Sequence, residues 1–222
     1  MDADTRETVM ETEQLIEDLV GALHPVRRLR SPPLRAGLWL AAVAVLVGLA
    51  LLGFADWARV MQRMAVPRIA LECAAAGVTG ICAVFAAFLL SVPGRSARWA
   101  ALPLPAFALW LGVSGLGCLR NGWSLHGPGG FVGDSSHCFG FIVGVSVPLS
   151  IGLFAVLRRA RPIAPLPVAA LGTLGVAALA DFILEFFHPF DVTVIDLALH
   201  LAGIAVVMGV GIALRRRLLA VG

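Results

Sequence analysis

The sequence predicts an all-α membrane protein: a bundle of six transmembrane helices preceded by a short cytosolic amphipathic helix. Hydrophobic residues make up 59% of the chain and charged residues only 14%, whereas a soluble domain has about 25% charged residues. Six apolar runs each approach the roughly 20 residues that cross a bilayer as a helix. Arginines are unevenly divided between the segments that join these runs. Together these features predict a polytopic membrane protein.

The apolar runs divide the chain into four parts. We expect the spans at 36–54, 69–91, 100–118, 138–157, 163–184 and 194–214. The predicted parts are an acidic tail at 1–24, a basic linker with prolines at 25–35, a membrane domain at 36–214 and a basic C-terminus at 215–222.

The arginines predict which side of the membrane each segment faces, because arginine clusters beside a span stay on the cytoplasmic side. Four of them precede the first span: Arg27, Arg28, Arg30 and Arg35. The segments assigned to the inside contain twelve arginines in total, and those assigned to the outside contain four. Both termini are therefore expected in the cytosol. The net charge of +3 follows from this distribution and does not indicate a surface for nucleic acid.

The tail has the spacing of an amphipathic helix over residues 7–23. Its apolar positions are Val9, Ile16, Leu19, Val20 and Leu23, and its acidic positions are Glu7, Glu11, Glu13, Glu17 and Asp18. Pro25 is expected to end the helix. The negative cytoplasmic leaflet repels an acidic helix, so the apolar face is expected to contact a protein. The alternative is a loosely ordered tail that packs on its own membrane domain.

Polar residues gather near the predicted outer ends of the last two spans. Asp181 and Glu185 are four residues apart, as are Asp196 and His200, so each pair shares a helix face. Carboxylates and imidazoles are costly inside a membrane and usually have a partner or a role. The simpler interpretation is that Asp181 and Asp196 hydrogen-bond neighbouring helices while the loop histidines are solvated.

A second interpretation of the same residues is a transition-metal site, because imidazole, carboxylate and thiolate ligands suit such ions. Its candidate ligands are His137, Cys138, His188, Glu185, Asp181, Asp196 and His200. No P-loop, dinucleotide fingerprint or Ser-His-Asp elbow appears in the sequence. Nothing in the sequence therefore argues for an enzyme.

The four cysteines fall into two pairs. Cys73 and Cys82 lie inside the second span and are expected to act as small apolar residues. Cys118 and Cys138 bracket the longest outside loop. A disulfide between them could persist in an oxidising periplasm, and two separate thiols are the alternative.

Small residues recur inside the spans and allow helix backbones to approach closely. Gly140 and Gly144 form a GxxxG pair, and looser pairs are Ala44/Gly48, Gly77/Gly80 and Gly112/Gly115. Both packing within one chain and packing between copies in a homo-oligomer are open at this point.

Three stretches resemble the NrsF (DUF1109) family: LIEDLVGALHPVRRLRSPPLRAGLWLA, FLLSVPGRSARWAALP and CFGFIVGVSVPLSIGLFAVLRRARPIAPLP. The resemblance covers essentially the whole chain. It implies a six-span bacterial inner-membrane protein that acts as an anti-sigma factor for an extracytoplasmic-function (ECF) sigma factor. The cytosolic tail would hold the sigma factor at the membrane and release it on an envelope, metal or oxidative stress signal.

Under this resemblance the tail supplies the residues that bind the sigma factor. The expected apolar contacts are Leu15, Ile16, Leu19, Val20 and Leu23, and the expected charged contacts are Glu13, Glu17 and Asp18. The acidic residues would complement the basic, DNA-facing surface of a sigma factor. The tail would therefore combine apolar burial with charge complementarity.

The family is also associated with outward-facing cysteines that sense metal or oxidative stress. Cys138 matches one such position. Where a second cysteine is expected, this sequence has FFHPFD, with His188 in place of a thiol. Cys118 is one candidate for the missing partner. The other candidate is a metal ion, acting as the signal, bound by Cys138 with His137 and His188.

A small transporter or channel is the alternative function. Its polar path would consist of Asp181, Glu185, Asp196 and His200. Transporters usually have broken helices near the middle of the membrane, whereas these residues lie near one face. Deletion of residues 1–24 separates the two functions, because a transporter should tolerate it and an anti-sigma factor should not.

Overall fold

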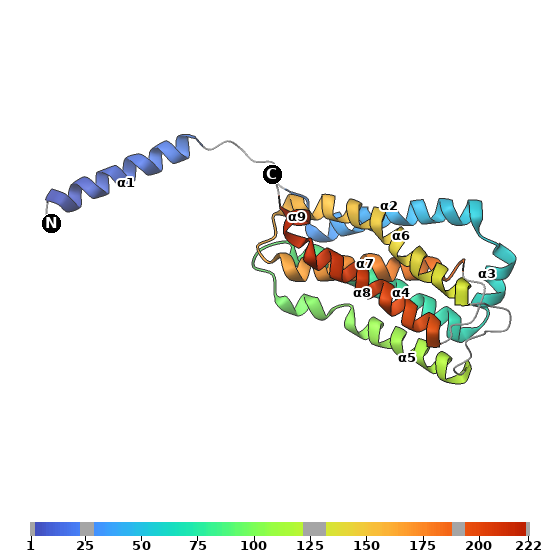
Figure 1. The fold of residues 1–222 in the computed structure, drawn as a ribbon. Helices are drawn as coiled ribbons and strands as arrows, with labels where there is room; N and C mark the ends of the chain where they lie inside the picture. The colour runs from blue at the N-terminus through green and yellow to red at the C-terminus, as the bar shows by residue number, and fades with distance from the viewer. Residues whose placement is uncertain (1–2, 23–28, 122–131, 188–193, 221–222) are drawn as a thin grey trace. The chain divides into compact units, whose positions relative to one another are not determined.

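The computed structural model describes residues 3–22, 29–121, 132–187 and 194–220, with side chains for 12–22, 29–117, 137–187 and 194–220. Its regular elements in these ranges are all helices, which confirms the predicted all-α class (Figure 1). The chain separates into two units, Met1–Arg30 and Ser31–Gly222. The boundary between the units falls inside the predicted linker.

The first unit contains one helix, α1 (Ala3–Gly21). The helix occurs where the alternation of apolar and acidic residues predicts it, and it begins a turn earlier than expected. Its last turn ends with the amide of Ala22 donating to the carbonyl oxygen of Asp18 at 3.0 Å. Leu23 and Pro25 lie outside the described residues. The cytosolic location of this helix stays a prediction.

Among its described residues, the second unit contains six helices that are long and apolar enough to cross a membrane. They are α2 (Pro32–Phe54), α4 (Pro67–Leu90), α5 (Leu104–Asn121), α6 (Val132–Leu157), α7 (Pro165–Leu184) and α8 (Val194–Ala213). Three of them begin at a proline, which fits the first turn of a helix because its missing N–H has no partner there. The bounds of these helices agree with the predicted spans to within a few residues at most ends.

Four short helices join or follow the long ones: α3 (Trp57–Met64), η1 (Ala97–Ala101), η2 (Arg158–Ala160) and α9 (Arg215–Leu219). The sequence analysis did not predict α3, because its eight residues are too few and too polar to resemble a span. Asp56 caps α3 by accepting a hydrogen bond from the Arg59 amide at 3.2 Å. We call the two ends of the bundle the α3 end and the α9 end (Figure 1).

Helices α4 and α7 form the most buried part of the bundle. Glycines let them approach closely. A Cβ atom on Gly80 would lie 2.7 Å from Leu179 Cγ, and one on Gly77 would lie 3.0 Å from the Phe182 ring. The Gly77/Gly80 pair therefore packs within the chain.

The other glycine pairs face outward. A Cβ atom on any of Gly48, Gly112, Gly115, Gly140 and Gly144 would meet nothing within 4 Å. The predicted Gly140/Gly144 motif thus does not pack against the described part of this chain. Its face is open to lipid or to another copy.

The first span packs on the bundle through only half of its length. Ala36, Trp39 and Val43 in α2 are buried against the core. Further along the same helix, Leu49 and Leu52 are exposed. Figure 1 shows α2 and α5 along opposite edges of the bundle. The second half of α2 therefore presents its apolar side chains to the surrounding bilayer.

Candidate functional site

The apolar face of α1 is exposed. Leu15, Ile16, Leu19 and Val20 retain between 53% and 60% of their accessible surface. The predicted charged contacts Glu13, Glu17 and Asp18 are exposed as well. The helix therefore leaves most of the predicted sigma-binding residues accessible, with the acidic residues flanking the apolar face. Leu23 lies outside the described residues.

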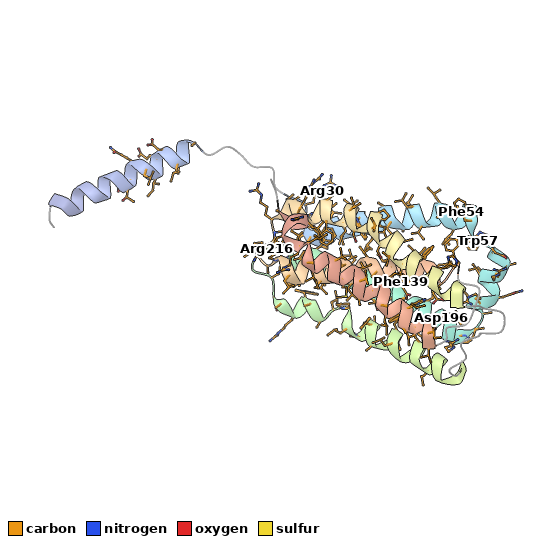
Figure 2. The ribbon with its side chains drawn as sticks, viewed as in Figure 1. Arg30, Phe54, Trp57, Phe139, Asp196 and Arg216 are labelled. Atoms are coloured by element: carbon orange, nitrogen blue, oxygen red, sulfur yellow. The ribbon has the colours of Figure 1, made fainter. Side chains whose placement is uncertain are left out.

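A buried polar cluster lies at the α3 end of the bundle. Its acidic members Glu72, Asp181, Glu185 and Asp196 are each at most 5% exposed, and His200 is 3% exposed. Figure 2 shows Asp196 toward the same end as Phe54 and Trp57, whereas Arg216 lies at the opposite end. This is the end that the arginine distribution assigns to the outside. Burying this many ionisable groups in a membrane domain requires partners for them.

One part of the cluster joins three helices. His200 Nδ1 in α8 lies 2.8 Å from Asp181 Oδ1 in α7, which is within ion-pair distance. The Cys138 side chain in α6 is a hydrogen-bonding neighbour of the same imidazole. The predicted candidates Asp181, His200 and Cys138 are therefore brought together. The sequence spacing suggested only that Asp181 shares a face with Glu185.

The other part of the cluster contains two arginines. Arg63 Nη2 in α3 lies 3.4 Å from Glu185 Oε2, and Arg68 Nη1 lies 3.1 Å from Glu72 Oε2 in the first turns of α4. The Ser114 hydroxyl in α5 donates to the other oxygen of Glu72. These contacts fix α3 and α5 to the central helices. Removing one partner of a buried ion pair would leave the other charge buried without compensation, which is costly. These ion pairs therefore oppose separation of the helices at this end of the bundle.

Sequence reasoning missed Arg63, Arg68 and Glu72 as members of the cluster. It counted the two arginines only among the four that lie in the segments assigned to the outside. One available signal was the i,i+4 spacing of Arg68 and Glu72, which is typical of an ion pair along a helix. The pairing of Arg63 with Glu185 is remote in sequence and leaves no such signal.

Arg35 is a correction to the sequence analysis. It was grouped with the arginines of the cytosolic linker, but it lies in the first turn of α2 and is only 7% exposed. Its Nη2 donates to the carbonyl oxygen of Val156 at 2.5 Å, and its guanidinium lies 5.3 Å from the centroid of the Phe88 ring. Arg35 thus fastens the start of α2 to α6 and α4. Arg30 is exposed as expected, and Arg27 and Arg28 lie outside the described residues.

The predicted metal site is only partly visible. Within 29–117, 137–187 and 194–220, no three His, Cys, Asp or Glu side chains are placed to hold a metal ion. His137 is exposed, unlike the buried members of the cluster. His188 lies outside the described residues, as does the Cys118 side chain. The complete ligand set and the Cys118–Cys138 disulfide therefore stay predictions.

The comparison with known protein families decides what kind of protein this is. A family model described as "Negative regulator of sigma F" (NrsF) matches residues 19–220. The chain belongs to the NrsF family. No curated protein and no solved structure matches the chain significantly. The expected family is thereby confirmed. A family that regulates a sigma factor implies a sigma factor as the partner. It is a family of regulators and not of enzymes.

The NrsF match spans parts of both units. It includes the whole membrane domain and begins at Leu19, so Leu19 and Val20 lie within it while Leu15 and Ile16 precede it. The second half of the exposed apolar face therefore lies within the matched region.

Proposed function

We propose that this NrsF-family chain is a bacterial inner-membrane anti-sigma factor that sequesters an ECF-type sigma factor through α1. Both termini lie in the cytoplasm in this proposal, in keeping with the twelve arginines on one side of the spans and four on the other. Envelope, metal or oxidative stress then releases the sigma factor. The observation that carries the proposal is the exposed apolar face of α1 in a regulator of sigma factors.

The chemistry of α1 suits such a partner. Leu15, Ile16 and Leu19 are each more than half exposed, and full burial of a fully exposed side chain of this kind contributes about 1.5–3 kcal/mol, which is the upper bound for each of them. Glu17 and Asp18 are exposed close to them. A sigma factor binds DNA through basic surfaces, so these carboxylates supply the complementary charge and favour fast association.

Leu19→Glu is expected to abolish stable binding of the sigma factor. The variant places a carboxylate in the centre of the apolar contact, which removes the burial of leucine and adds an unpaired charge. We expect the dissociation constant to rise about 100-fold, equivalent to roughly 2.7 kcal/mol. The measurement is co-purification and titration of the cognate sigma factor with the detergent-solubilised full-length chain.

Gln14→Glu is the matched control, because it adds the same charge on the opposite face of α1. The control should retain the sigma factor almost fully. Equal retention by Leu19→Glu would exclude the apolar face as the binding surface. If the wild-type chain retains no sigma factor, the proposed anti-sigma function is wrong.

Cys138→Ser is expected to make the response to a thiol oxidant disappear while sigma binding persists. Cys138 is 4% exposed at the start of the membrane-crossing part of α6, beside His200. Its oxidation would therefore disturb packing between α6 and α8. The measurement is sigma-dependent reporter expression in cells treated with diamide, with Cys82→Ser as the control from α4. A normal response in the Cys138→Ser strain would contradict a sensor role for this thiol.

A further inference from the structure

The α9 end of the bundle contains a cavity that the proposed regulation does not use. It has a volume of about 300 Å³ and lies between the turn that follows α4 and the turn that precedes α7. Each turn includes a residue with a left-handed backbone, Gly94 at φ +79° and Arg161 at φ 47°. Arg161 caps the end of η2, and Gly94 reverses the chain within the turn after α4.

The walls of the cavity are apolar. Leu90 and Ala100 form one side, and Ile163 and Pro167 form the other. Ile163 is 79% exposed, so its side chain is accessible to a lipid chain. On the other side of η1, Trp99 is 41% exposed and lines a second hollow. Tryptophan at the end of a span is typical of the membrane interface.

The rim of the cavity is strongly basic. Arg95 lines the cavity directly, and Arg98 lines the hollow next to it. Both side chains are exposed, as are Arg158, Arg159 and Arg161 on the facing turn. No aspartate or glutamate occurs in residues 90–104 or 157–168. The two turns therefore present uncompensated positive charge above an apolar space.

We propose that this cavity binds an anionic phospholipid, with the phosphate at Arg95, further attraction from the neighbouring Arg98, and an acyl chain along Ile163 and Leu90. A soluble anion would use the arginines but not the apolar walls, and a zwitterionic lipid would gain little from the net positive charge. Basic pockets between membrane helices bind anionic headgroups in this way. The position at the ends of membrane-crossing helices puts the arginines at the depth of the headgroups.

The test compares phosphatidylglycerol with phosphatidylcholine of the same acyl chains, added to the detergent-solubilised full-length chain. Native mass spectrometry counts the bound lipid, and thermal unfolding measures the stabilisation. We expect phosphatidylglycerol to bind at least tenfold more tightly than phosphatidylcholine. The double variant Arg95→Gln/Arg98→Gln should lose this preference. Ile163→Ser should weaken the binding of phosphatidylglycerol without restoring the binding of phosphatidylcholine.

The matched control is Arg216→Gln/Arg217→Gln, which removes the same charge from α9 at the same end of the bundle. It should keep the preference. An equal loss in both double variants would show unspecific attraction to basic residues and overturn the proposal. Equal binding of the two lipids, or displacement of the lipid by inorganic phosphate, would also overturn it. The arginines changed in both double variants are exposed. Both variants should therefore unfold at the wild-type temperature in the absence of lipid.

Discussion

Asp181→Leu is expected to lower the unfolding free energy of the membrane domain by about 3–5 kcal/mol, the usual cost of removing one partner from a buried ion pair. Asp181 is 1% exposed and lies 2.8 Å from His200 Nδ1. The substitution leaves a buried imidazole without its carboxylate. A single hydrogen bond between membrane helices contributes only about 0.6–2 kcal/mol, so the two mechanisms predict measurably different losses. Unfolding in mixed micelles with increasing denaturing detergent measures the change.

Two further variants make this prediction specific. The double variant Asp181→Leu/His200→Leu should be less destabilised than the sum of the single variants, because neither polar partner is then left buried alone. Asp56→Asn is the control, since its partner Arg59 is 3.7 Å away and both side chains are more than half exposed. Exposed pairs contribute about 0–1 kcal/mol. Additive single variants would contradict a direct interaction between Asp181 and His200.

Gly175→Val is expected to destabilise the membrane domain by about 1–3 kcal/mol through overpacking between α4 and α7. A Cβ atom at Gly175 would lie 2.8 Å from Val84 Cγ2, 3.0 Å from Val84 N and 3.1 Å from Gly80 O. Two of these atoms belong to the backbone, so a rotamer change cannot relieve the clash. The helices must separate along their most buried contact.

Gly209→Val provides the comparison for this prediction. A Cβ atom at Gly209 meets nothing within 4 Å, and both glycines lie inside helices, so differences in helix propensity largely cancel. Thermal unfolding in detergent should therefore show a lower midpoint for Gly175→Val than for Gly209→Val. Equal midpoints would mean that α4 and α7 do not approach as closely as the structure indicates.

The positions of the six spans and of α1 could be predicted from the sequence alone. The lengths of the apolar runs predicted six spans, and prolines at 32, 67 and 165 lie where three of them begin. The alternation of apolar and acidic residues predicted α1. These features are local, because bilayer thickness and helical periodicity act on consecutive residues. The family resemblance likewise rested on short stretches in a fixed order.

Only the tertiary structure showed which polar side chains of different helices pair with one another. Asp181 pairs with His200 on another helix, and Glu185 pairs with Arg63, although sequence spacing placed the two acids on one face. Arg35, which the sequence analysis assigned to the linker, lies in the first turn of α2 and is buried against α6 and α4. Gly175 lies against Val84 of α4. The physical reason is that lipid is as apolar as a helix interface. In a membrane span the hydrophobic pattern therefore does not reveal which face meets another helix, and only packing does.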